Sequence, residues 1–435
     1  MTLVGEGFSS DSGGAGLGDD GRGGDAQWVS PLAELPGAVV LDDLDADQTK
    51  GEGDFEEAPG GAENTAQESG AAGYGAIAHY GDPSGEQWAL EAGRALVDRP
   101  DLAVVEVRGP DRLTWLTSIS SQVLTGIEAG ESRELLILDP QGHIEYAAGA
   151  IDDGKALYLV TERSGAQGLV DWLNSMRFAL RVEVTLSQGW WILGSVGNSG
   201  VSNYEQVAMT WNDPWPGVVD GGAEYFRGSH PGKNVSFHIH LIPKERAREF
   251  WQAWSNDQPK RRAAGINAWE AVRIAAWRPR LGYETDGRSM PAELDWLRTA
   301  VHTNKGCYRG QEAVARVLNL GRPARRLVFL QLDGSRGDIP QRGQFIELSG
   351  RRVGIVTSVA RHADMGPIAL ALVSRALPPQ VVLDLDGIAA AQELIVPVDG
   401  KSSVSPKERP GAGLHNPELR RPNIPALGGK SIGSR

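Results

Sequence analysis

The sequence predicts an α+β fold with several domains, and two observations support this prediction. Between about residues 74 and 321, helical patterns alternate with strand patterns, and short hairpins rather than long crossovers join many of the strands. From residue 322 to 399 only strand patterns follow one another, separated by Gly, Pro and Asp turns, which indicates a small antiparallel β-barrel or sandwich.

The first set of elements begins with a helix and continues with strands, a helix, two more strands and a second helix. The turn DPQG joins two strands as a hairpin, and Pro and Asp in the first turn favour the start of the helix before it. The predicted elements are a helix at 86–99, a strand at 102–109, a helix at 110–124, strands within 134–152, a strand at 155–162 and a helix running into a strand at 168–186.

A second set of elements completes the α+β region. It contains two strands, a long loop rich in Gly and Pro between them, and two amphipathic helices. The predicted elements are a strand at 189–197, a loop at 211–232, a strand at 234–242 and helices at 245–254 and 265–277. We therefore expect two interleaved subdomains within residues 74–321, followed by the barrel at 322–399.

The two ends of the chain differ from this body in composition. Residues 1–73 hold 16 acidic and 2 basic residues, a net charge of −14, and few large apolar groups. Such a segment buries too little apolar surface to offset the entropy of ordering, so we predict a disordered acidic tail whose removal leaves the fold intact. One acidic and apolar piece, residues 30–47, is an alternative docking motif. Residues 400–435, rich in Pro, Gly and cations, are predicted to be a disordered basic tail.

Composition also limits the class of protein. A single cysteine excludes an internal disulfide and any zinc or iron–sulfur site built from several cysteines of one chain. No apolar run approaches the roughly 18 residues of a membrane span, and no signal peptide is recognisable. The body lacks the basic stripe of a nucleic-acid-binding protein. We expect a soluble cytoplasmic protein that contacts neither membranes nor nucleic acid directly.

The one cysteine lies in the stretch NKGCYRGQEAVAR. Cys307 has a lysine two residues before it and an arginine two residues after it, and glycines loosen the backbone on both sides. Nearby cations and a following helix start lower the pKa of a thiol in general, and a partly exposed thiolate is a nucleophile or metal ligand. We therefore predict a functional thiol at Cys307 with Lys305 beside it. The alternative is a buried structural cysteine at a domain junction.

KGCYRGQE closely resembles the K-G-C-Y-x-G-Q-E motif of the YgfZ-type folate-binding proteins, which are related to the aminomethyltransferase T of the glycine cleavage system. Softer similarities lie at RGPDRLTWL, ILDPQGHI and the strands of residues 350–373, so that the resemblance covers about residues 76–395. It implies a ring-like aminomethyltransferase-type fold around a tetrahydrofolate-binding channel. It also implies a role in the assembly, maintenance or repair of iron–sulfur clusters in client enzymes, including a radical enzyme that modifies tRNA.

Carried over along the motif, the resemblance points to functional roles for Lys305, Cys307, Tyr308, Gln311 and Glu312. It implies an accessory protein rather than an enzyme in its own right, with a folate as cofactor and iron–sulfur enzymes as partners. Since the chain has one cysteine, a transient iron–sulfur cluster on Cys307 needs further ligands from a partner, a second copy or glutathione. No firm metal site follows.

One departure from the T protein bears on the choice between accessory protein and transferase. Where the T protein carries an acidic pair after its hairpin turn, this chain has Glu145 followed by Tyr146. A single carboxylate leaves the general base for one-carbon transfer in doubt, although burial would raise the pKa of Glu145 toward a useful range. A folate-dependent aminomethyltransferase is therefore the alternative function. The alternative for Glu145 itself is an exposed hairpin residue without a catalytic role.

The ligand pocket is predicted near the helix and loop AVRIAAWRPRLGYETD. A pterin needs an aromatic ring to stack on, and the anionic glutamate of a folate needs arginine or lysine. Arg273 and Trp277 are the chosen residues of this stretch, which also contains Arg278, Arg280 and Tyr283. A solvated basic loop is the alternative.

Two histidine arrangements complete the candidates. His238 and His240 alternate on one strand and face the same side, but no third metal ligand is obvious, so two ordinary sheet histidines are preferred. His302, five residues before the thiol, is the nearest partner for a cysteine–histidine pair, and a thiol enzyme of that kind is the least favoured hypothesis.

Overall fold

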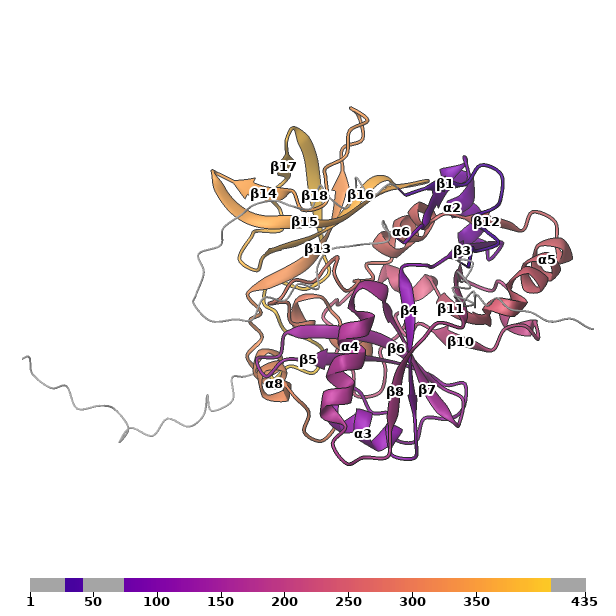
Figure 1. Cartoon of the computed structure of the whole chain (residues 1–435). Coiled ribbons are helices and arrows are strands. Elements are labelled where there is room, and N and C mark those ends of the chain that lie inside the picture. The colour runs from indigo at the N-terminus through magenta and orange to yellow at the C-terminus, as the bar shows by residue number, and fades with distance from the viewer. Residues whose placement is uncertain (1–27, 42–73, 408–435) are drawn as a thin grey trace, which may run out of the picture.

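A computed structural model describes residues 28–41 and 74–407 of the chain. Two five-stranded sheets and a closed barrel of six antiparallel strands form the body, which confirms the predicted α+β class and the C-terminal barrel (Figure 1). In Figure 1 the barrel, orange to yellow, lies at the top of the view.

The first sheet is antiparallel with strand order β5-β6-β7-β4-β8. Two helices, α3 (Arg112–Ile119) and α4 (Arg163–Met176), cover one face, where Trp115, Leu116 and Leu169 are buried against the strands. The strands are β4 (Leu102–Arg108), β5 (Ser132–Leu138), β6 (Ile144–Asp152), β7 (Ala156–Glu162) and β8 (Glu183–Ser187). The predicted helix 110–124 is shorter than expected because Ser120 adopts an extended conformation.

The second sheet has the order β10-β11-β9-β3-β12, with β12 parallel to β3. Helix α5 (Ala247–Asp257) packs on one face, and α2 (Pro83–Glu91) and α6 (Ile266–Ala275) pack on the other, where α6 also contacts the barrel. The strands are β3 (Ala95–Asp98), β9 (Trp190–Val196), β10 (Met209–Asn212), β11 (Phe237–Pro243) and β12 (Arg262–Ala264). The predicted helix 86–99 is therefore a helix followed by a strand.

The barrel has the closed order β13-β16-β15-β14-β17-β18. Its strands are β13 (Arg325–Leu332), β14 (Phe345–Leu348), β15 (Arg351–His362), β16 (Gly366–Ser374), β17 (Leu383–Leu385) and β18 (Ile388–Leu394). Alternate residues of β13 face two cores. Val328 and Leu330 fill the barrel, whereas Leu327 and Phe329 face the rest of the protein.

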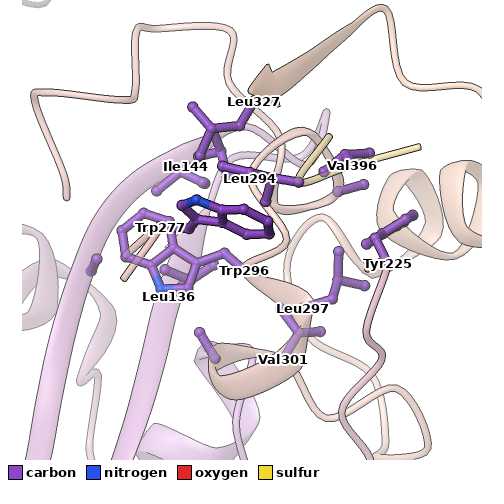
Figure 2. Packing of buried hydrophobic residues seen from close by; sticks show 14 of the residues in the cluster. Leu136, Ile144, Tyr225, Trp277, Leu294, Trp296, Leu297, Val301, Leu327 and Val396 are labelled. Atoms are coloured by element: carbon purple, nitrogen blue, oxygen red, sulfur yellow. The ribbon is translucent and has the colours of Figure 1, made fainter. Parts of the chain in front are cut away.

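One apolar core joins the barrel to the first sheet. Figure 2 shows the rings of Trp277 and Trp296 in this core, close to Leu136 and Ile144 of the sheet and to Leu327 of the barrel. The short helix α7 (Leu297–Ala300) and helix α8 (Gln311–Leu320) contribute to the same core. Because all these elements share one core, the segment between α7 and α8, which carries Cys307, rests on a rigid base.

The N-terminal segment corrects the prediction of a uniformly disordered tail. Residues 28–41 lie on the second sheet, with Leu32 fully buried beside Trp191 and Phe250. The short strand β1 (Val39–Val40) pairs antiparallel with β2 (Ile77–His79). At the other end of the chain, residues 400–407 are also ordered, since Ser405 donates a hydrogen bond to the carbonyl of Leu318. The rest of both predicted tails and the end of the predicted docking motif lie outside the described residues.

Candidate functional site

The segment around Cys307 is positioned by close contact with the β5–β6 hairpin. Gly310 begins α8 with a φ of +81°, and a Cβ at this position would lie 2.5 Å from the carbonyl oxygen of Asp139 and 3.0 Å from Gly142. A side chain is therefore excluded here by both conformation and space. The second glycine of the motif thus lets the thiol segment pack against the hairpin turn.

Lys305 binds the thiol segment to the end of helix α3, whereas Cys307 forms no hydrogen bond to that helix end. Its ammonium donates hydrogen bonds to the carbonyl oxygens of Thr117 and Ser120, at the C-terminal end of α3. A cation at this end of a helix satisfies free carbonyls and complements the helix dipole. The ammonium also lies 4.6 Å from the centre of the Tyr308 ring. Burial lowers the pKa of Lys305 to about 8.

The residues on either side of Cys307 differ sharply in exposure. Cys307 is exposed, and no heavy atom lies within 4 Å of the position that a Cβ on Gly306 would take. Tyr308 turns inward to the shared core, and burial raises its pKa to about 12. The alternative of a buried structural cysteine is therefore excluded, and a reagent or partner can reach the thiol.

The other two polar residues of the motif have separate contacts. Gln311 donates a hydrogen bond of 3.2 Å from Nε2 to the carbonyl oxygen of Lys305 and so closes the segment on itself. Glu312 is largely exposed and pairs with Arg316 one turn along α8. Neither contact involves a ligand pocket.

Glu145 meets the thiol segment through a β-bulge. Ile137 pairs with Tyr146 and Leu138 with Ile144, so Glu145 is the extra residue of β6. The bulge turns Ile144 toward the shared core and Tyr146 toward α4. Glu145 Oε2 lies 2.6 Å from Nη1 of Arg309, the variable position of the motif. This pair is not recognisable from the sequence, since 164 residues separate its members.

A pocket lies between the two sheets. Its volume is about 110 Å³, below the roughly 300–1,000 Å³ that is usual for sites that enclose a whole small molecule. Trp211, Trp269 and Trp296 supply aromatic walls, and β6 and β7 supply a floor of small side chains. The remaining polar lining residues are Arg99, Glu134, Thr161, Glu162, Asp213, Arg273, Arg278 and Arg280.

Arg278 is the centre of charge in this pocket. It donates to Glu134 at 2.5 Å and to Asp213 at 2.8 Å, while its Nη1 is buried without a hydrogen-bond partner. Burial raises the pKa of Asp213, Arg278 opposes that shift, and nearby Glu134 raises it further. A guanidinium shared by two carboxylates with one donor left over is suited to a ligand that brings one more acceptor.

The structure places only some of the residues expected at a ligand pocket along this one. Arg273, Arg278 and Arg280 line the pocket, but each is already paired with a carboxylate. Trp277 does not line it, because a φ of +60° turns its ring into the core against Phe226 and His230. Tyr308, Gln311 and Glu312 do not line it either. The residues missed from the sequence include Glu134, Asp213 and Trp269, whose strand and helix patterns resembled ordinary core positions.

The thiol segment and the pocket both contact the β5–β6 hairpin, but at different points along it. Glu134 of β5 lines the pocket, whereas Asp139 after β5 contacts Gly310. Five residues of strand span about 17 Å. Thr299 of α7 donates a hydrogen bond of 2.5 Å to Glu134, and the chain then continues to Lys305 and Cys307. Pocket and thiol are therefore separate features joined by a rigid hairpin and a short stretch of chain.

The histidines have structural partners. Both ring nitrogens of His240 are bonded to hydroxyls, those of Ser195 at 2.8 Å and Thr210 at 2.9 Å, and burial lowers its pKa to about 3. His302 lies 3.9 Å from Asp220, and no hydrogen bond joins it to Cys307 in the described part of the chain. No group of three or more possible metal ligands occurs within residues 28–41 and 74–407.

Comparisons with known proteins agree with this architecture. The tRNA-modifying protein YgfZ of Edwardsiella ictaluri is 38% identical over 309 residues, which cover 68% of this chain and 90% of that protein. YgfZ of Serratia proteamaculans is 26% identical over 280 residues, covering 62% and 81% of the two chains. No family model matches the chain.

A solved structure supports the fold. The glycine cleavage system aminomethyltransferase T from Bartonella henselae matches with a TM-score of 0.59 and 20% identity, covering 75% of this chain and 93% of that one. The likeness confirms the predicted aminomethyltransferase-type fold. Among the described residues, no helix is long and apolar enough to cross a membrane.

Proposed function

The chain belongs to the YgfZ family of aminomethyltransferase-like proteins, and on this premise we propose that it is a folate-binding accessory protein for iron–sulfur enzymes. Its clients include radical enzymes that modify tRNA, in keeping with the name of its relatives. The observation that carries the proposal is the exposed Cys307 on a rigid segment, separate from a pocket lined by tryptophan and arginine.

The pocket suits a folate in two respects. Its tryptophan walls offer a flat surface to a pterin, and the unpaired Nη1 of Arg278 offers a donor to a carbonyl or carboxylate. Asp213, whose pKa burial raises, changes between hydrogen-bond donor and acceptor with its protonation state. A bound tetrahydrofolate supplies an amine that carries one-carbon units. The residues of the chain bind, orient and shield it.

The thiol has a different task from the pocket. Cys307 offers one sulfur ligand or nucleophile to a partner, because the part of the chain that the structure describes has no second thiol and the sequence has no other cysteine. A cluster held on it requires further ligands from outside the chain. Lys305 and Tyr308 hold the segment in place, so that Cys307 projects outward.

One-carbon transfer is the weaker alternative. Glu145, the one acidic residue at the position of the T protein's pair, is bound to Arg309 and does not line the pocket. A general base must reach the proton that it removes. The contacts of Glu145 favour a role in fixing the hairpin to the thiol segment.

The first test is a titration of tetrahydrofolate followed by tryptophan fluorescence. We expect saturable quenching in the wild type. Leu281, a half-buried pocket residue, is changed to Trp to fill the pocket, and the exposed Leu180 is changed to Trp as a control that adds the same fluorophore elsewhere. The proposal requires loss of binding in Leu281→Trp and normal binding in Leu180→Trp. An absence of saturable binding to the wild type would refute the folate proposal.

The second test separates the two functions. Cys307→Ser and Glu145→Gln are compared for their ability to restore the activity of an iron–sulfur tRNA-modifying enzyme in cells that lack the chain. We expect Cys307→Ser to abolish that support and Glu145→Gln to retain it. Support that survives Cys307→Ser but is lost with Glu145→Gln would overturn the accessory-protein proposal in favour of the transferase.

A further inference from the structure

A second cavity lies at the edge of the second sheet, away from the pocket and the thiol. It is an open cleft of about 580 Å³ between the turn after α2, the loop after β9 and the end of α5. Its walls are mostly polar, and none of its lining residues lines the first pocket. The residues that matter are Arg94, Gly200, Asn203, Tyr204 and Arg261.

Arg261 is a buried cation in the wall of this cleft. Its side chain is 5% exposed and lies over the ring of Trp254 at 4.7 Å. The nitrogen Nη1 is satisfied by Tyr204, Trp254 and Asp257 at 2.8–3.0 Å. By contrast, Nε has no partner, and Nη2 has only a long contact of 3.4 Å to the carbonyl oxygen of Ser199. Arginine stays charged in proteins, so each of its nitrogens needs a hydrogen-bond acceptor. Two of the donor nitrogens of Arg261 are therefore poorly satisfied.

Gly200 opens a seat beside this guanidinium. It has a φ of +68°, and the position of a Cβ on it would lie 3.4 Å from Arg261 Nη2 and 3.8 Å from Asn203 Nδ2, with no other heavy atom within 4 Å. Asn203 is exposed, and its amide has no hydrogen-bond partner among the described residues. Two donors from different parts of the chain therefore face one open space.

The charge around the seat favours an anion. Arg94, exposed at the rim, makes no ion pair within residues 28–41 and 74–407. The carboxylate of Asp257, the acidic residue of the cleft, is 52% exposed and pairs with Nη1 of Arg261, which leaves Nη2 and Nε without a carboxylate partner in the described part of the chain. Oxyanions accept charge-assisted hydrogen bonds from guanidinium and amide donors.

We propose that this cleft is a second binding site, which holds a phosphate or carboxylate group of a small molecule between Arg261 and Asn203. Arg94 adds long-range attraction, and Tyr204 holds the guanidinium in place. The site goes beyond the folate proposal, because it shares no residue with the folate pocket and its test involves neither folate nor the thiol.

Isothermal titration calorimetry on the full chain tests the site, with inorganic phosphate and acetate titrated separately at a constant ionic strength set with potassium chloride. Saturable heat is expected from at least one of the two anions. The anion that binds shows whether the ligand of the site carries a phosphate or a carboxylate group. Asn203→Asp removes a donor and places a negative charge at the seat, so affinity is expected to fall about tenfold or more. Because Asn203 is exposed, the variant is expected to fold.

Asn256→Asp is the matched control, since Asn256 lies at the end of α5, which borders the cleft, but does not line the cleft itself. It makes the same change of charge and is expected to retain binding. Two results would overturn the proposal: heats of both anions that equal those of added chloride, or equal affinities in Asn203→Asp and the wild type.

Discussion

Glu145 and Arg309 join the β5–β6 hairpin to the thiol segment, with 2.6 Å between Oε2 and Nη1. Arg309 also lies 5.9 Å from the centre of the Trp172 ring on α4. The bulge in β6 turns the carboxylate of Glu145 toward Arg309, which pairs with it. The candidate general base of the alternative transferase function thus has a structural contact in this chain.

Glu145→Gln is expected to weaken this link without affecting the folate pocket. Both side chains are about 30% exposed, so the loss in stability is expected to be about 0.5–1 kcal/mol. Urea unfolding measures the stability, and tetrahydrofolate titration is expected to give an affinity within twofold of the wild type. Glu312→Gln, which breaks the exposed pair with Arg316, is the control. A tenfold loss of folate affinity in Glu145→Gln would contradict this assignment.

Substitutions at Lys305 and Cys307 are expected to have different effects on stability, although the two residues are only two positions apart. Lys305→Met keeps an apolar stem beside Tyr308 but leaves the carbonyls of Thr117 and Ser120 without their donor, so we expect a loss of about 1–2 kcal/mol in stability. Cys307→Ser alters an exposed atom and is expected to stay within about 0.5 kcal/mol of the wild type. Thermal unfolding of both variants checks this. Equal stability of Lys305→Met and the wild type would disprove the capping role of the lysine.

Local patterns predicted the elements and the thiol segment better than the pocket. KGCYRG with its glycines and cations was enough to expect an accessible Cys307, which the structure confirms as exposed. Glu134 was not recognisable, because its function as a lining residue depends on Arg278, 144 positions away. Trp277 is predicted to line the pocket because it is an aromatic residue in a stretch rich in arginine. Its left-handed backbone, uncommon for a bulky residue, sends it into the core instead.

The N-terminal segment was mispredicted for a related reason. Its acidic composition is typical of disorder, yet Leu32 and the β1–β2 pair depend on contacts with residues 77–79 and α5. Removal of residues 1–27 is expected to leave stability unchanged. Removal of residues 1–41 exposes the site of Leu32, which alone is worth about 2–3 kcal/mol, and also uncovers Trp191. The expected result is a clear drop in the unfolding midpoint for the longer deletion only. Equal midpoints for both deletions would show that the segment does not stabilise the body.

The same segment contributes to a pH-dependent contact at Asp98. This carboxyl group is 7% exposed and accepts hydrogen bonds from Ser30 of the segment and from Trp191. Burial raises its pKa to about 6, and the two hydrogen bonds limit the rise. Since the unfolded value is about 3.9, the folded state binds more protons than the unfolded state between these two pH values. The stability that this group contributes is therefore greatest at low pH and is lost as pH rises through about 6.

Asp98→Asn removes this titration and keeps an oxygen that accepts from Trp191. We expect the stability of the variant, relative to the wild type, to increase by about 2–3 kcal/mol between pH 4 and pH 7. Urea unfolding at each pH gives the difference directly. Asp364→Asn is the control, because that exposed carboxylate also accepts from a tryptophan, Trp88, and its variant is expected to show no such trend. A constant difference between Asp98→Asn and the wild type over this range would mean that Asp98 titrates alike in both states, and that its burial does not penalise its charge.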